Sequence, residues 1–264
     1  MNRTFSIVDS AKRVLNKSLN KETKAKIRAT QNLIDSLLMN GKRKRFYKQF
    51  IKSGDLCFDI GANEGNRIKP ILELGAKIIA IEPQQECVNK IKKRFGDKVT
   101  ILQVGIGAKN ETKTFHISDA NTLSTFSEEW IESVQSTGRF EGYSWSSERQ
   151  IEIITLDSLI KTYGHPHFVK VDVEGYELEV LKGLTEPIPV ISFEYAVPEF
   201  SHRAVDCLNL LLTLSSNIKC NFSIGESMHW ALDRWLKGEE MIELVQSQSF
   251  TKTGAGDIYV KATL

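Results

Sequence analysis

The chain has 264 residues, of which 41% are hydrophobic, and a formal net charge of +2. This composition predicts a soluble globular protein with a sizeable core and argues against a disordered or fibrous chain. No apolar run approaches the roughly 20 residues that span a bilayer, and basic residues interrupt the first 30 residues too often for a secretory signal. We therefore expect a cytoplasmic protein without a transmembrane segment.

The charge is distributed unevenly along the chain. Residues 1–50 hold 13 Lys/Arg against 3 Asp/Glu, whereas the remaining residues hold 22 against 30. A basic segment of this kind indicates either an anionic partner or a solvated helical face. No CxxC pair occurs, so we expect reduced structural thiols at the four cysteines, Cys57, Cys87, Cys207 and Cys220.

Residues 1–45 are predicted to form a basic helical segment. Two sets of apolar residues recur with helical spacing: Ile7, Ala11, Val14 and Leu15, and then Ile34, Leu37 and Leu38. Gly41 is a plausible helix end. We expect these helices to pack on a domain of residues 46–264 rather than to form a second core.

From Gly54 onward, short apolar strands alternate with helices. The predicted strands are 55–60, 77–81, 99–104, 168–173, 190–194, 221–224 and 257–261. The predicted helices include 84–95, 176–184 and 203–214. Because nearly all strand residues are apolar, we expect a mostly parallel sheet covered by helices on both faces, a doubly wound α/β domain.

One stretch breaks this alternation. Residues 112–118 and 150–155 alternate apolar and polar side chains, as antiparallel strands do, and they flank a polar and aromatic insertion at 119–149. Long insertions in compact domains often cover a binding site. Its aromatic residues either stack on a ligand or pack internally: Trp130, Phe140, Tyr143 and Trp145.

A glycine turn follows the first predicted strand. The sequence Asp59-Ile-Gly61-Ala62-Asn63-Glu-Gly65 lets the backbone turn sharply and approach a ligand. Its G-x-x-x-G spacing differs from the G-x-G-x-x-G that binds a dinucleotide pyrophosphate, which disfavours an NAD enzyme. A carboxylate at the strand end instead suits a cofactor without phosphates.

An acidic residue ends the second predicted strand. Glu82 lies 23 residues after Asp59, where a carboxylate can accept hydrogen bonds from both hydroxyls of a ribose. Glu82 followed by Pro83 is also common at a helix start. Taken together with the glycine turn, the residue favours nucleoside binding.

Charged residues cluster around the fourth strand. In Lys170-Val-Asp172-Val-Glu174-Gly175, alternation places the three charged side chains on one strand face, and Glu194 ends the next apolar run. Charges on a buried strand are costly unless they are paired or lie at a site. The cluster predicts either an active site or a structural ion-pair network.

These motifs together resemble the FkbM family of methyltransferases, which use S-adenosylmethionine (SAM). The resemblance covers roughly residues 46–195 and continues weakly to Gly256-Asp257, but it includes neither the N-terminal helices nor the insertion. It implies a Rossmann-like class I methyltransferase fold with a seven-stranded sheet, N-terminal helices and an inserted β-hairpin or lid. It also implies methylation of a hydroxyl on a sugar, glycan or natural product. One departure is Asn66-Arg67, where the family often has an aromatic residue.

The resemblance also implies roles for individual residues. The methionine part of SAM would lie against Asp59, Gly61, Ala62, Asn63 and Gly65, its ribose at Glu82 beside Pro83, and its adenine near Gly105 and Ile106. Asp172 and Glu174 would face the transferred methyl group, with Lys170 and Glu194 completing the catalytic set.

The chemistry of the carboxylates leaves two mechanisms open. Asp172 is the first candidate for a general base that removes the hydroxyl proton, and Glu174 is the second. Alternatively, a divalent cation shared by Asp172, Glu174 and Glu194 would lower the hydroxyl pKa. The positive charge of Lys170 on the same face argues against a metal, so we predict none.

Two other functions compete with this prediction. The basic N-terminal segment favours an RNA methyltransferase, but base-methylating enzymes usually carry Asn/Asp-Pro-Pro-aromatic where this chain has Asp172-Val-Glu174-Gly175. A non-catalytic binding module is disfavoured by the intact glycine turn, Glu82 and Asp172. The prediction is therefore a small-molecule or glycan acceptor rather than a nucleic acid, with the oligomeric state open.

Overall fold

The computed structural model describes residues 21–263, and the chain divides into two compact units, Met1–Lys42 and Arg43–Leu264. Helix α2 (Lys21–Tyr47) runs through Gly41, so the helix end predicted there is wrong. Good helix formers flank this glycine, and Lys44 and Arg45 complement the dipole of the last turn. The first predicted apolar set, from Ile7 to Leu15, lies outside the described residues.

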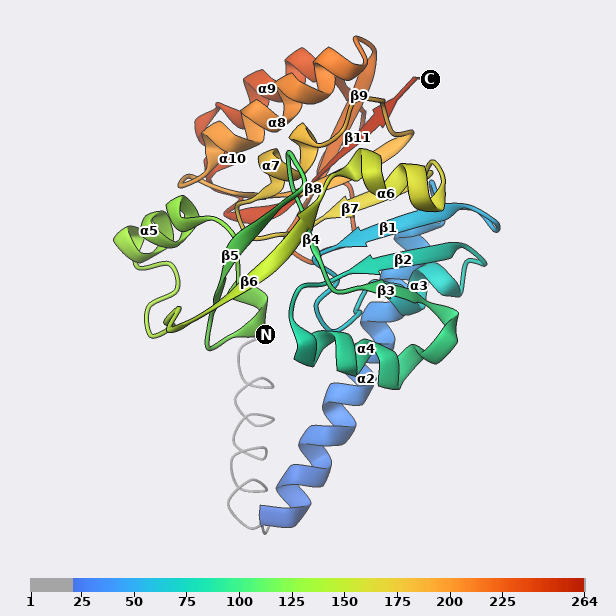
Figure 1. The fold of residues 1–264 in the computed structure, drawn as a ribbon, viewed down its shortest axis with the longest axis vertical. Helices are drawn as coiled ribbons and strands as arrows, with labels where there is room; N and C mark the ends of the chain where they lie inside the picture. The colour runs from blue at the N-terminus through green and yellow to red at the C-terminus, as the bar shows by residue number, and fades with distance from the viewer. Residues whose placement is uncertain (1–20, 264) are drawn as a thin grey trace, which may run out of the picture. The chain divides into compact units, whose positions relative to one another are not determined.

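The second unit is an α/β domain built on a mostly parallel sheet (Figure 1). In the described residues this sheet has eight strands in the order β10-β9-β11-β8-β7-β1-β2-β3. They are β1 (Leu56–Ile60), β2 (Lys77–Ile81), β3 (Thr100–Leu102), β7 (Phe168–Val171), β8 (Val190–Ala196), β9 (Ile218–Ile224), β10 (Leu236–Lys237) and β11 (Ala255–Ala262).

Strand direction follows the predicted α/β alternation. The strands β3, β2, β1, β7 and β8 are parallel, whereas β11 pairs antiparallel with both β8 and β9. The predicted sheet lacked only the two-residue edge strand β10. A class I methyltransferase fold of the Rossmann-like type is therefore confirmed, because its strand order and its reversed strand are both present.

Helices connect the strands and cover the sheet on both faces. After α2 they are α3 (Ile68–Leu72), α4 (Gln85–Phe95), α5 (Glu128–Thr137), α6 (Leu156–Tyr163), α7 (Glu177–Lys182), α8 (Ser201–Leu214), α9 (Gly238–Val245) and α10 (Gln248–Thr251). None of these described helices has the length and apolarity needed to cross a membrane. The four cysteines are buried and free, as predicted.

The inserted β-hairpin is part of a small second sheet with the order β4-β6-β5 (Figure 1). Strands β5 (Glu111–Ile117) and β6 (Ser147–Ile154) pair antiparallel, and β4 (Gly105–Ile106) pairs parallel with β6. The insertion between them contains α5. Phe115 and Ile153 join the main core, so this sheet packs directly on the domain.

The two faces of the main sheet differ in chemistry. Val169, Val171 and Phe193 face an apolar core that also includes residues of α7, α8 and α9. The opposite face carries a row of buried polar and charged side chains, which are Asp59, Lys170, Ser192, Asn221, Ser223 and Asp257. Aromatic residues from the end of α2, from the turn that follows it and from the loop before β10 pack beside this row, namely Phe46, Tyr47, Phe50 and Trp230. This polar face underlies the candidate site.

Candidate active site

A cavity lies at the carboxyl ends of β1, β2 and β7. Ligands of open α/β sheets bind at this edge. Eight predicted site residues line the cavity: Gly61, Asn63, Glu82, Pro83, Gly105, Ile106, Asp172 and Glu174. The structure therefore brings together segments that are more than 100 residues apart in the sequence.

Glu82 is buried at the end of β2, with its carboxylate in the cavity wall. Its Oε2 accepts a hydrogen bond from Asn63 N at 2.7 Å, and its Oε1 accepts one from Gln84 N at 2.8 Å. Burial raises the pKa of Glu82 to about 7, although these two backbone donors oppose the shift. Each carboxylate oxygen keeps a free lone pair, so the group can still accept hydrogen bonds from a ligand.

The glycine turn brings the end of β1 close to the end of β7. Gly61 has a φ of 78°, and a Cβ atom there would lie 1.8 Å from the carbonyl oxygen of Asp172. No other residue fits between the two strand ends. At the other end of the turn, Gly65 packs against Ile68 and Phe95 rather than lining the cavity. Close packing of the chain therefore requires both glycines.

Asp59 and Lys170 lie on the polar face of the sheet and not in the cavity lining. The two residues are register partners on β1 and β7. Asp59 Oδ2 is buried and has no hydrogen-bond partner among the described residues. Burial raises the pKa of Asp59 to about 6, and the positive charges of Lys170 and Arg67 limit the shift. Asp59 on β1 is thus a buried acceptor without a hydrogen-bond donor for its Oδ2, and it lies beside β7, the strand that leads to Asp172.

Lys170 joins two carboxylates from different strands. Its Nζ lies 2.8 Å from Asp172 Oδ2 and 3.2 Å from Asp257 Oδ1. Burial alone would lower the pKa of Lys170, but the charges of Asp172 and Asp257 outweigh it and raise the pKa. Lys170 therefore stays charged and fixes one oxygen of Asp172. Sequence reasoning did not assign Asp257, because its partner lies 87 residues away.

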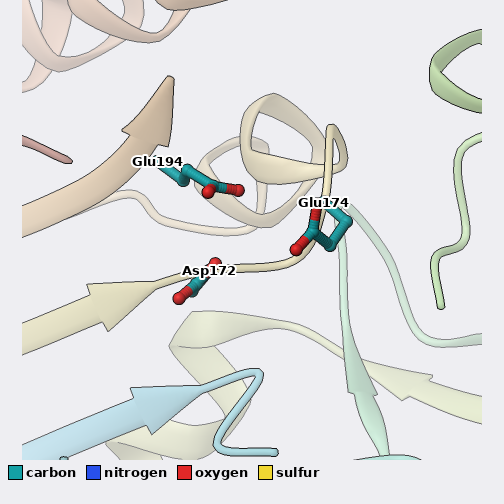
Figure 2. A group of neighbouring side chains, drawn as sticks. All are labelled: Asp172, Glu174 and Glu194. Atoms are coloured by element: carbon teal, nitrogen blue, oxygen red, sulfur yellow. The ribbon is translucent and has the colours of Figure 1, made fainter. Parts of the chain in front are cut away.

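Three carboxylates converge beside the cavity. Asp172 follows β7, Glu174 lies in the next loop and Glu194 comes from β8, and their side chains point toward one shared space (Figure 2). One oxygen of each lies within 4.8 Å of the others. This set offers the hard oxygen donors that a divalent cation takes, and it equally suits carboxylates that share protons.

Burial and neighbouring carboxylates raise the pKa values of the glutamates in this group. Burial, and then the charge of Asp172, raise the pKa of Glu174 well above its ordinary value. Burial, and then the charge of Glu174, do the same for Glu194. Glu177 lies nearby, where burial raises its pKa to about 7 while its Oε1 accepts from Val173 N at 3.0 Å.

Four residues of the insertion line the same cavity as Glu82, namely Asn121, Thr122, Ser124 and Phe126. Gln84 Nε2 donates to Asn121 O at 2.8 Å, and Asn121 Nδ2 donates to Glu64 Oε1 at 3.3 Å. The first residues of the insertion thus belong to the wall of this cavity. That the insertion covers an acceptor site stays a prediction. Sequence reasoning also missed other lining residues, which are Gln84, Val104, Phe115, Ser124 and Phe126.

The aromatic residues of the insertion mostly pack internally. Trp130 is 2% exposed and lies against Gly175, where an added Cβ would be 2.3 Å from the indole. Trp145 packs edge-on against Trp130 and donates its indole N–H to Leu123 O at 2.7 Å. Tyr143 is 48% exposed. The structure thus supports core packing for Trp130 rather than stacking on a ligand.

Thr125 ties the insertion to the loop that carries Glu174. Its Oγ1 donates to Glu174 O at 2.7 Å and accepts from Ser127 N at 3.0 Å, and the residue is 1% exposed. We expect Thr125→Val to lower the free energy of unfolding by about 1–3 kcal/mol, because it leaves buried backbone groups unpaired. Thr125→Ser keeps the hydroxyl and is the matched control in urea titrations. Equal losses for both variants would contradict the role of the hydrogen bonds.

Comparison with known proteins identifies relatives of this chain. Residues 59–224 match the methyltransferase FkbM domain. A hexuronic acid methyltransferase of Haloferax volcanii, AglP, is 27% identical over 144 residues. The match covers 53% of this chain and 54% of that protein, so the chain spans about half the length of the curated relative it matches.

Solved structures that align with this chain have low sequence identity to it. A TehB-like SAM-dependent methyltransferase from Corynebacterium glutamicum aligns over 92% of this chain and 98% of its own, with 8% identity and a TM-score of 0.44. A precorrin-6y C5,15-methyltransferase from Geobacter metallireducens aligns over 86% of each chain, with 11% identity and a TM-score of 0.42.

Proposed function

Because the chain belongs to the FkbM methyltransferase family, we propose that it transfers a methyl group from SAM to a hydroxyl of a sugar or glycan. The observation that carries this proposal is the position of Asp172 and Glu174 at the wall of a cavity that also holds Glu82, with Glu194 converging on them. The sugar-modifying relative supports the acceptor class.

The cavity residues fit SAM in their chemistry. Glu82 has free lone pairs for the two ribose hydroxyls, and Asn63 lies next to it on the glycine turn. Ile81, Ile106 and Phe126 provide apolar walls for adenine. When bound, SAM supplies a methyl group on a sulfonium, which is already activated for displacement.

The residues of this chain must then orient the acceptor and remove one proton. Asp172 would accept the proton of the acceptor hydroxyl while the new oxygen–methyl bond forms and the carbon–sulfur bond breaks. Lys170 holds one oxygen of Asp172 and keeps it oriented. Glu174 and Glu194, with raised pKa values, would hold protons and donate hydrogen bonds to the acceptor.

We expect direct proton removal, without a divalent cation. Lys170 already supplies a positive charge to Asp172, and raised pKa values favour protonated Glu174 and Glu194. Turnover should therefore stay unchanged after treatment with a chelator, and Glu174→Gln should cost less activity than Asp172→Asn. Activity that is lost with the chelator and restored by Mg²⁺ or Mn²⁺ would contradict this mechanism.

A further inference from the structure

Two arginines and one glutamate join three distant segments of the domain. Arg67 follows the glycine turn, Arg43 belongs to the last turns of α2, and Glu226 lies two residues beyond β9. Arg67 Nη1 donates to Glu226 Oε2 at 2.6 Å, and Arg67 Nη2 donates to Glu226 Oε1. Arg43 Nη2 donates to Glu226 Oε2 at 3.2 Å. One carboxylate thus accepts from two guanidinium groups.

Sheet topology places this ion-pair cluster across the edge that holds the candidate active site. Strands β7, β8 and β11 separate β1 from β9, and four strand spacings amount to about 19 Å. The loops after β1 and β9 both follow the carboxyl ends of their strands, the edge of the sheet at which Asp172 also lies. The charge of Lys170 also acts on Glu226.

The two sides of the cluster differ in burial. Arg67 and Arg43 side chains are 9% and 12% exposed, whereas the Glu226 side chain is 52% exposed. Partial burial would raise the pKa of Glu226, but hydrogen bonds and charge from Arg67, and then the charge of Arg43, lower it to about 2. The two arginines are thus largely buried, and the glutamate that binds to them is the accessible member of the cluster.

The arginine pair retains a hydrogen-bond donor that Glu226 does not use. Both guanidinium groups donate to the single carboxylate of Glu226, and Arg43 Nε is buried without a hydrogen-bond partner among the described residues. Arginine forks bind carboxylates in the bidentate geometry that Glu226 shows here. An acceptor carboxylate bound to these arginines would be kept apart from the carboxylates of Asp172, Glu174 and Glu194.

We propose that Arg67 and Arg43 form a subsite for a carboxylate of the acceptor, such as that of a uronic acid, and that Glu226 occupies this subsite in the free protein. The proposal rests on the proposed function. The acceptor would displace Glu226, place its carboxylate on the arginines and direct its hydroxyl to the three carboxylates. Arg67 would then select for acidic sugars.

The test uses calorimetric titration of the full chain saturated with S-adenosylhomocysteine (SAH), with D-glucuronate, D-glucose and inorganic phosphate as probes. Glu226→Gln should bind glucuronate about 10-fold or more tightly than the unmodified chain, because it removes the competing charge. Affinity for glucose should not change. Adding Arg67→Gln should abolish the gain, whereas Arg45→Gln, which removes an exposed guanidinium from the same part of α2, should not.

Three results with Glu226→Gln would overturn the subsite. The first is an unchanged affinity for glucuronate, and the second is an equal gain in affinity for phosphate. The third is loss of SAH binding or of the circular dichroism spectrum of the folded chain, which would mean that the cluster only stabilises the structure. An unmodified chain that binds no SAH would instead contradict the proposed function, so the two failures are distinguishable.

Discussion

Replacing Asp172 with asparagine should lower turnover by about 100-fold or more, which is the usual scale for loss of a general base. The amide has the same shape as the carboxylate but cannot take up the hydroxyl proton. Asp172 is the carboxylate that Lys170 contacts at 2.8 Å, beside two glutamates whose pKa values are raised. Single-turnover rates with a verified acceptor measure the effect without product release.

The same variant should bind SAH almost as well as the unmodified chain, because the amide keeps the contact surface of Asp172 in the cavity. Asp97→Asn, at an exposed carboxylate after α4, is the matched control and should leave turnover unchanged. If Asp172→Asn turned over at a near-normal rate, the base would lie elsewhere, and Glu174 would be the next residue to replace.

Replacing Glu82 with glutamine should weaken SAH binding by about 10- to 100-fold, the scale of losing charge-assisted hydrogen bonds. The amide nitrogen must also face a backbone N–H, because Asn63 N and Gln84 N both donate to the native carboxylate. Calorimetry measures the change, with Glu86→Gln as the control on the exposed first turn of α4. Unchanged affinity in Glu82→Gln would place the ribose elsewhere.

The pH dependence of SAH affinity provides an independent check on Glu82. Burial raises the pKa of Glu82 from 4.5 to about 7, so the folded state holds a proton that the unfolded chain has released. Between these two values, its contribution to stability falls as pH rises. Ribose hydroxyls donate to the ionised form, so SAH affinity should rise through pH 7, by roughly 10-fold per unit below the pKa. Glu82→Gln should lose this rise.

Local patterns in the sequence were sufficient to predict the sheet and the main cavity residues. The parallel strands are nearly all apolar because both of their faces are buried, which marks β1, β2 and β7 clearly. The glycine turn and Glu82 follow such strands directly. Strand adjacency then brings Glu194 beside Asp172, since β7 and β8 pair in parallel.

Contacts between distant segments were not predictable in the same way. The ion pair between Arg67 and Glu226 could not be predicted, because the two residues are 159 positions apart. Neither residue belongs to a repeating pattern of apolar and polar positions that would indicate its burial. Asp59 follows the motif of a ligand-binding residue, but strand alternation turns its side chain to the polar face below the cavity. The place of Asn121, Thr122, Ser124 and Phe126 in the cavity wall could not be predicted, because irregular loops show no hydrophobic periodicity.

The most direct test of the central claim is turnover of methyl-labelled SAM against a panel of neutral sugars, uronic acids, nucleotide sugars and RNA, with mass analysis of each product. The proposed function predicts a single labelled methyl group, ether-linked to a sugar oxygen, together with one equivalent of SAH, and no such product with Asp172→Asn. Label in an RNA base, or binding of NAD without binding of SAM, would contradict it.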